Sequence, residues 1–146
     1  MATMLTIDSL VLDILIADCD RRRPQEACGL LIGRREAGTL RVTRCLPVDN
    51  VWPEDRERTS RYAIDPLVQL RAEQDAAASG SELVGMYHSH PHGPAVPSQF
   101  DADRAWPGYI YLIVGFEPPV GPSARAWALD NAGTFAEHLF LSEKSI

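Results

Sequence analysis

Two histidines and an aspartate near the middle of the chain have the residue types and spacing of a metal site: His88-Ser89-His90, then Asp101. The apolar, partly β-branched residues before His88 predict a buried strand that runs into the motif. Side chains at i and i+2 of a strand leave the same face, so His88 and His90 point to one place and Ser89 points away. Pro91 ends the strand, and Asp101 can fold back to the same place after the turn.

Two imidazoles and one carboxylate make a nitrogen and oxygen ligand set that suits zinc. Three protein ligands leave a fourth position for water, which is typical of catalytic zinc sites rather than structural ones. Zinc lowers the pKa of a bound water to about 7, so a nucleophile becomes available near neutral pH. The sequence therefore predicts one zinc ion per chain, with His88, His90 and Asp101 as candidate ligands.

Two other side chains are alternative ligands. His92 continues the i+2 series and competes with Asp101 for the third position, although Pro91 breaks the strand before His92 can share the face. Cys28 lies in another predicted strand and could approach the metal, but free cysteine is among the most buried residue types, so a place in the core is favoured over a place in the ligand set. An isolated His-x-His pair can also be two ordinary surface or core histidines.

The motif extends beyond these residues, and at this point the sequence resembles the JAMM (MPN-plus) metalloprotease family, as a small bacterial-type member. The family motif is an upstream glutamate, His-x-His-Pro, a serine eight residues later and an aspartate three further on. Here these positions are Glu26, His88 to Pro91, Ser98 and Asp101, with no departure in spacing. The resemblance implies that Glu26 takes a proton from the attacking water and returns it to the leaving amine. It also implies that Ser98 donates a hydrogen bond to the developing oxyanion.

The same resemblance suggests a substrate. Relatives cut bonds after the Gly-Gly tail of ubiquitin or ubiquitin-like proteins, and small bacterial forms are associated with sulfur-carrier proteins. Because the chain has no long insertion after Asp101, a sulfur-carrier substrate is favoured over ubiquitin itself. Two alternatives stay open: a metal-free interaction module of the same fold, and a metallohydrolase of a non-protein amide.

Alternating strands and helices must position these residues. We expect a single α/β domain over residues 1–146, with a mixed sheet flanked by helices in the cytidine-deaminase-like arrangement that the resemblance implies. Asp65 and Pro66 are typical of a helix start, and Ser98 with Asp101 forms a possible capping box. The predicted helices cover 7–22, 66–80 and a short segment after Ser98; the predicted strands cover 25–33, 39–46, 61–64, 82–90, 109–115, 124–129 and 134–141.

The polar segment 49–60 is either a solvated connection or a flap beside the metal, with Trp52 as the candidate substrate-binding residue. Trp106, Trp127 and Phe135 are expected in the core, and His138 at the surface or at a sheet edge.

Composition excludes several classes of protein. The chain has 146 residues, 45% hydrophobic and 23% charged, which is ordinary for one globular domain. A formal net charge of −6 argues against a nucleic-acid partner. No long apolar run or export signal is present, and three cysteines suit a reducing compartment, so we expect a cytoplasmic protein without membrane association. The sequence does not specify the oligomeric state.

Overall fold

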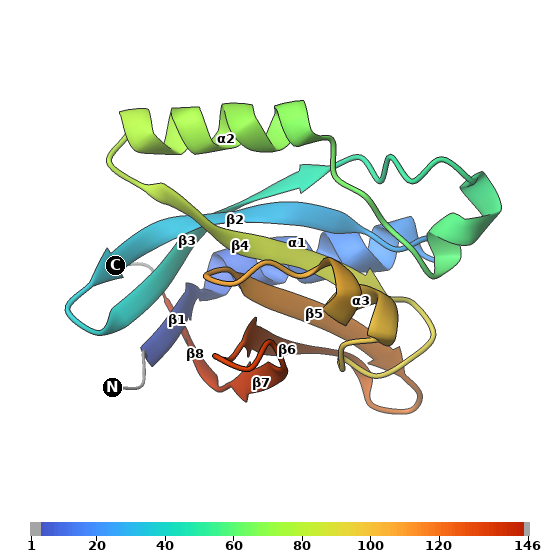
Figure 1. Ribbon diagram of the computed structural model, residues 1–146. Helices are drawn as coiled ribbons and strands as arrows, with labels where there is room; N and C mark the ends of the chain where they lie inside the picture. Colours follow the sequence, from blue (N-terminus) through green and yellow to red (C-terminus); the bar gives the residue numbers. More distant parts are fainter. Residues whose placement is uncertain (1–3, 145–146) are drawn as a thin grey trace.

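The structure is a computed structural model that describes residues 4–144 (Figure 1). In chain order the elements are β1 (Met4–Asp8), α1 (Ser9–Arg22), β2 (Cys28–Glu36), β3 (Thr39–Val48), the 3-10 helix η1 (Asp55–Thr59), α2 (Pro66–Ala78), β4 (Glu82–His90), α3 (Gln99–Arg104), β5 (Ile110–Glu117), β6 (Gly121–Leu129), β7 (Phe135–His138) and β8 (Phe140–Glu143). The predicted α/β class, with a mixed sheet flanked by helices, is confirmed.

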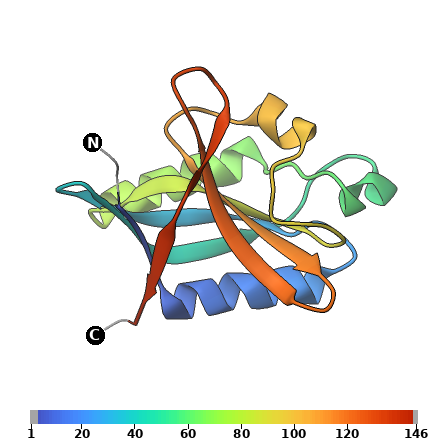
Figure 2. The ribbon, with the colours of Figure 1, turned by 90° about the horizontal axis from the view of Figure 1, so that it is seen from below.

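All eight strands belong to one sheet, in the order β7-β6-β5-β4-β2-β3-β1-β8. The pairs β1–β3, β1–β8 and β4–β5 are parallel and the others antiparallel. Strands β7 and β8 lie at opposite ends of this order, yet only Leu139 separates them in the chain. The sheet must therefore curl until its two edges come close, as the crossing of the last strands in Figure 2 shows.

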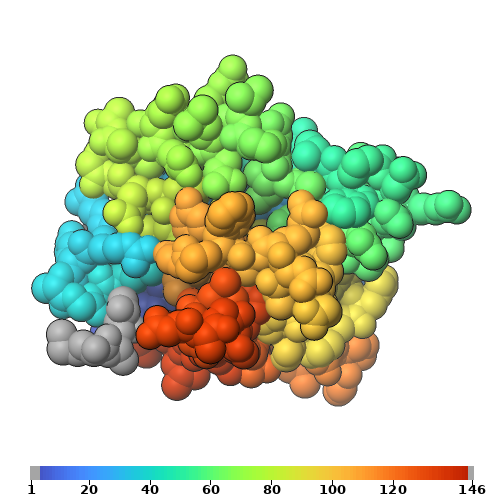
Figure 3. Space-filling model, viewed as in Figure 1, coloured from blue at the N-terminus to red at the C-terminus, as the bar shows by residue number. Residues whose placement is uncertain are grey.

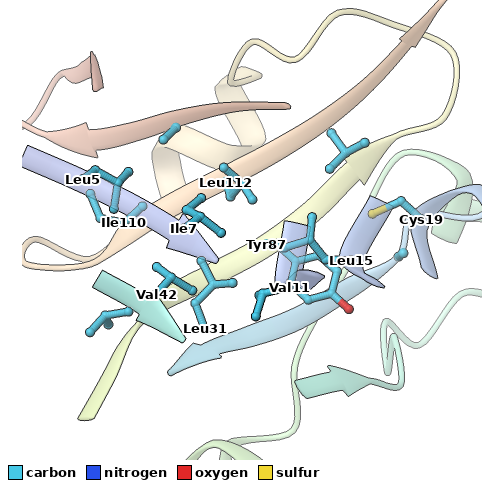
Figure 4. Close-up of a cluster of buried hydrophobic side chains, with 14 of the residues drawn as sticks. Leu5, Ile7, Val11, Leu15, Cys19, Leu31, Val42, Tyr87, Ile110 and Leu112 are labelled. Carbon is cyan, nitrogen blue, oxygen red and sulfur yellow. The ribbon is translucent and has the colours of Figure 1, made fainter. Parts of the chain in front are cut away.

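Two hydrophobic clusters cover the two faces of the sheet. On one face, Val11 and Leu15 of α1 pack against Leu31, Tyr87 and other buried side chains of the strands (Figure 4). On the other face, Ala72 and Ala76 of α2 pack against a second cluster that includes Leu30, Ile32, Met86 and Tyr111. Consecutive strand residues alternate between the faces, so β4 presents Tyr87 to α1 and Met86 to the side of α2.

Several predicted boundaries differ from the structure. The N-terminal helix begins at Ser9 rather than residue 7, because residues 4–8 form β1, whose Leu5 and Ile7 are buried. Strand β2 begins at Cys28, so Glu26 precedes the strand instead of heading it. The C-terminal segment is divided: β7 pairs with β6 as a hairpin, whereas β8 crosses to the opposite end of the sheet and pairs with β1.

The predicted strand over 61–64 is wrong. Residues 61–64 do not form a strand, and the Asn50 side chain makes hydrogen bonds to their backbone instead. The Asn50 amide donates to the Arg61 carbonyl at 2.9 Å and accepts from the Ala63 N–H at 3.2 Å. A side chain can satisfy backbone groups as a neighbouring strand would.

The aromatic residues expected in the core divide into two groups. Trp106 is 67% exposed, so its placement in the core was wrong. Trp127 and Phe135 are half-buried: the Trp127 ring nitrogen donates to the Ala95 carbonyl at 3.0 Å, and Phe135 lies edge-on to Tyr111. None of the helices that the structure describes has the length and apolar character needed to cross a bilayer.

Candidate metal centre

Strand β4 holds both histidines at its C-terminal end, in the middle of the sheet. His88 lies between Cys28 of β2 and Ile113 of β5 in the strand register, and it is 1% exposed. By alternation along β4, His88 shares the face of Met86 and His90 follows on the same face. The predicted orientation of the pair is confirmed, since their rings lie 5.2 Å apart between centroids.

Helix α3 brings Asp101 to the histidines. The Ser98 hydroxyl accepts from the Asp101 N–H at 3.1 Å, and Asp101 Oδ2 accepts from the Ser98 N–H at 2.9 Å, which is the predicted capping box. The same Oδ2 lies 3.0 Å from His90 Nε2 and 3.2 Å from His88 Nε2. One ligand atom from each of the three residues lies within 4.8 Å of the others.

The donors in this cluster fit a metal ion. Neither ring nitrogen of His88 makes a hydrogen bond of regular geometry to any described residue, although both are buried and Nε2 lies 3.2 Å from Asp101 Oδ2. Such groups are costly unless a ligand completes them. His90 Nδ1 lies 2.9 Å from the Pro94 carbonyl, which leaves Nε2 directed at Asp101. Hydrogen bonding of one ring nitrogen to a carbonyl is the usual way that proteins orient a histidine ligand.

The electrostatics of His88 and Asp101 also favour a role as metal ligands. Burial lowers the pKa of His88 and outweighs the opposing effect of Asp101, so His88 is neutral and has a free lone pair. Burial acts to raise the pKa of Asp101, but the adjacent His88 and His90 outweigh it and hold that pKa well below its usual range. Asp101 is therefore ionised at all ordinary pH values.

Glu26 occupies the segment before β2 and is only 5% exposed. Its backbone is fixed on both sides: its N–H donates to the Arg58 carbonyl at 2.7 Å, and its carbonyl accepts from the Asn50 amide at 3.1 Å. Its Oε1 has no hydrogen-bond partner within residues 4–144. Burial raises the pKa of Glu26 to about 8, with Asp101 adding to the rise and His90 opposing it. A carboxyl group with a pKa in this range can exchange protons near neutral pH.

The face of β4 opposite the site is hydrogen-bonded to helix α1. The Tyr87 hydroxyl donates to Asp18 Oδ2 at 2.7 Å, and both groups are buried. Gly29 leaves space for the Tyr87 ring, because a Cβ at this position would collide with that ring. On the same face, the Ser89 hydroxyl accepts from the Ala27 N–H at 2.8 Å. Tyr87 and Ser89, the two neighbours of His88 in the chain, are thus fixed by hydrogen bonds on the face of β4 opposite the site.

Tyr62 is a site residue that the sequence analysis missed. Its ring stacks on the His88 imidazole, with 4.5 Å between centroids and 22° between the ring planes. Burial raises the pKa of its hydroxyl well above the ordinary value, with Asp101 adding to the rise. The only available signal was an aromatic residue shortly before a helix start at Asp65, which does not by itself predict contact with a histidine.

Trp52 lies near the site, but its ring is engaged within the protein. It contacts Phe100 of α3 edge-on at 5.3 Å, and its ring nitrogen donates to Glu57 Oε1 at 3.0 Å. Arg61 and Arg104 lie over both aromatic rings. The segment 49–60 therefore contacts α3 through Trp52, while most of its other residues are exposed, and substrate binding by Trp52 stays a prediction.

The two alternative ligands are not part of the cluster. Cys28 is buried, and its Sγ faces the carbonyls of Val48 and Asp49 at 3.8 and 3.7 Å. His92 is exposed in the turn after β4. Among the described residues, the group that could hold a metal ion contains His88, His90 and Asp101 and neither alternative.

A groove of about 470 Å³ leads away from Asp101 between α2 and the segment that carries α3. In Figure 3 these are the green and orange surfaces, which meet near the centre of the view. Its lining is mixed: the side chains of Tyr62, Ile64, Leu70, Met86 and Phe100 are apolar or aromatic, and those of Glu73, Asp101 and Arg104 are charged.

Comparison with known proteins identifies the family. The model of prokaryotic homologues of the JAB domain matches residues 9–130. A desampylase of Haloferax volcanii is 41% identical over 109 residues, which cover 74% of this chain and 73% of that protein. A probable TtuB-protein conjugate cleaving protease of Thermus thermophilus is 40% identical, covering 65% of this chain and 59% of that protein.

Two further relatives match nearly the whole chain. A CysO-cysteine peptidase of Mycobacterium tuberculosis is 28% identical and covers 97% of this chain and 93% of its own length. The solution structure of a Desulfitobacterium hafniense protein superposes with a TM-score of 0.85 at 30% identity, covering 98% of this chain and 95% of that one. The chain therefore belongs to the prokaryotic JAB-domain family, as the spacing of Glu26, the two histidines, Ser98 and Asp101 predicted.

Proposed function

We propose that this protein is a zinc-dependent peptidase or isopeptidase that releases ubiquitin-like or sulfur-carrier proteins from conjugates by cutting after their C-terminal Gly-Gly. One observation carries the proposal: the ligand atoms of His88, His90 and Asp101 converge, and Glu26 interacts electrostatically with His90 and Asp101 through a buried carboxyl group whose Oε1 has no hydrogen-bond partner among the described residues. Hydrolases commonly combine a metal that activates water with a nearby group that exchanges protons near neutral pH.

In this proposal His88, His90 and Asp101 hold the zinc ion. When bound, zinc would polarise the scissile carbonyl and make a water molecule more acidic. Glu26 accepts a proton from the attacking water and returns it to the nitrogen as the carbon–nitrogen bond breaks, so that water adds across the amide. Ser98 Oγ already accepts from the Asp101 N–H, and its own hydroxyl proton is available for the oxyanion.

The substrate class follows from the relatives and the groove. The three curated relatives are named for the removal of protein modifiers or for cleavage of CysO-cysteine. In this chain, an extended tail would enter the partly apolar groove beside Asp101, and terminal glycines would allow its backbone to approach the buried histidines closely. We place the protein in the cytoplasm, which its three free cysteines support.

A cleavage panel tests the proposal. TtuB and CysO, each extended beyond Gly-Gly by a short peptide or joined to a lysine side chain, are incubated with the zinc-loaded protein, and products are identified by mass spectrometry. We expect cleavage directly after Gly-Gly, lost by at least about 100-fold in Glu26→Gln. Failure to cut any such conjugate, with zinc bound and the fold intact, would contradict the proposed function.

A further inference from the structure

The Asn50 side chain joins three segments of the chain that meet beside the candidate metal centre. Asn50 lies between β3 and η1, in a stretch without helix or strand. Its Nδ2 donates to the Glu26 carbonyl at 3.1 Å and to the Arg61 carbonyl at 2.9 Å. Its Oδ1 accepts from the Trp52 N–H at 3.1 Å and from the Ala63 N–H at 3.2 Å. Both N–H groups and both lone pairs of this amide are therefore used within the protein.

The four partners specify both the orientation and the chemical type of this side chain. Two partners are carbonyl oxygens and two are backbone N–H groups, so exchanging the amide nitrogen and oxygen would break all four bonds. Among side chains of this length, an amide alone offers two N–H donors beside an acceptor oxygen. Aspartate has nearly the same shape but offers acceptors only. The arrangement therefore depends on asparagine at position 50.

On one side, these hydrogen bonds hold Glu26. Glu26 lies outside helix and strand, so individual hydrogen bonds determine where its backbone sits. Its N–H donates to the Arg58 carbonyl, its carbonyl accepts from Asn50, and the next residue, Ala27, is bonded to Ser89. None of these contacts involves a candidate metal ligand. A change at Asn50 can therefore displace Glu26 while the metal ligands stay in place.

On the other side, the same amide holds Tyr62. Arg61 and Ala63, the residues before and after Tyr62, are each bonded to the Asn50 side chain. The Tyr62 ring stacks on His88, and Tyr62 and Ala63 line the groove beside the metal centre. In the proposed function this groove takes the carrier tail. The Asn50 amide thus connects one wall of the groove to the proposed general base.

We propose that Asn50 is a positioning residue of the hydrolysis, which holds the Glu26 carboxyl group in register with a carrier tail bound against Tyr62. The inference rests on the proposed function and adds a residue outside the motif that carries it. Asn50 takes no proton and acts only through Glu26, which must reach both the attacking water and the leaving nitrogen. A displacement of about 1 Å at such a group can cost about 100-fold in rate.

Asn50→Asp separates the two halves of the hydrogen-bond set. The carboxylate keeps the acceptor sites, including the one for the Ala63 N–H in the groove wall, and turns an oxygen toward the two carbonyls. With CysO extended beyond Gly-Gly by a short peptide, kcat should fall at least about tenfold, whereas KM should change less than about twofold. Zinc content should stay at the wild-type value. Asn131→Asp, the same change in the exposed turn after β6, should alter neither constant.

A double-mutant cycle with Glu26→Gln distinguishes positioning from a general loss of structure. If Asn50 acts through Glu26, Asn50→Asp should cost little further rate in the Glu26→Gln background, followed as single turnovers over long incubations. An unchanged kcat in Asn50→Asp, or an equal loss in both backgrounds, would overturn the inference and leave the proposed function intact. Failure of the zinc-loaded wild type to cut any conjugate would instead contradict the proposed function itself.

A measurement on the wild type does not depend on any variant folding. The Trp52 and Ala63 N–H groups lie outside helix and strand and donate to Asn50 Oδ1, so their hydrogen exchange reports on these bonds. In the zinc-loaded protein, both should exchange at least about tenfold more slowly than in an unstructured peptide, as followed by nuclear magnetic resonance. Exchange of both at the unstructured rate would show that Asn50 does not hold these segments, and would overturn the inference.

Discussion

The Ser89 hydroxyl accepts a 2.8 Å hydrogen bond from the Ala27 N–H, and the Ser89 N–H donates to the Ala27 carbonyl at 3.1 Å. Ser89 lies between the two histidines, and Ala27 follows Glu26. One fully buried side chain therefore fixes the segment of Glu26 against the strand that carries the candidate ligands. Ser89, whose side chain points away from the site, therefore holds the segment of Glu26 next to His88 and His90.

Ser89→Ala tests this link. The change leaves the Ala27 N–H without its side-chain acceptor, and we expect a loss of about 1–3 kcal/mol in the free energy of unfolding, measured with urea. We also expect zinc to remain bound while kcat/KM falls about tenfold or more, because Glu26 is displaced and the ligands are not. Ser123→Ala, at an exposed position of β6, should change neither quantity. Full activity in Ser89→Ala would show that Ser89 does not position Glu26.

Tyr62 stabilises the orientation of His88 through ring stacking. Tyr62→Ala should weaken zinc binding by about three- to tenfold, as expected for an aromatic contact, in competition with a chromophoric chelator. Tyr62→Phe retains the ring and should keep the wild-type affinity. If both variants bind zinc as the wild type does, the stacking contributes nothing to the site.

Glu26 makes the stability of the zinc-free protein dependent on pH. Burial raises its folded-state pKa from 4.5 to about 8, so the folded state holds the proton more tightly than the unfolded state. The free energy of unfolding should therefore fall between pH 5 and 8, on the order of 3 kcal/mol in total. Glu26→Gln should remove this fall, and Glu54→Gln, at an exposed position, should retain it. A fall of the same size in Glu26→Gln would assign the effect to another group.

Trp52 stays the predicted substrate-binding residue, and its contact with Phe100 makes a specific effect testable. Trp52→Ala should loosen the segment 49–60 beside the groove and raise KM about three- to tenfold with a smaller change in kcat. An unchanged KM would show that Trp52 only packs the segment. Circular dichroism and zinc content check that the variant is intact.

The sequence predicted the parts of the site that depend on short-range geometry. Alternation along β4 placed His88 and His90 together, and the capping pattern of Ser98 and Asp101 formed as expected. The helix start at Asp65 was also correct, with its side chain accepting from the Leu67 N–H. These features need only a strand, a turn or one helical turn, so neighbouring residues specify them.

Features that join distant segments could not be predicted in the same way. The stacking of Tyr62 on His88 and the bond from Asp18 to Tyr87 depend on how the chain folds back, and no local pattern marks them. The apolar residues of β1 continue into the helical periodicity of α1, so Ile7 was assigned to the helix. The pairing of β8 with β1 brings the two ends of the chain together at one edge of the sheet.

The metal content of the purified protein tests the central claim most directly. Elemental analysis should give about one zinc per chain for the wild type, and a loss of zinc in His88→Ala and in Asp101→Ala. His92→Ala is the matched control, since this exposed histidine lies outside the cluster and its loss should leave zinc in place. Folded wild-type protein that neither contains zinc nor takes it up would contradict the account, as would zinc retained in both ligand variants.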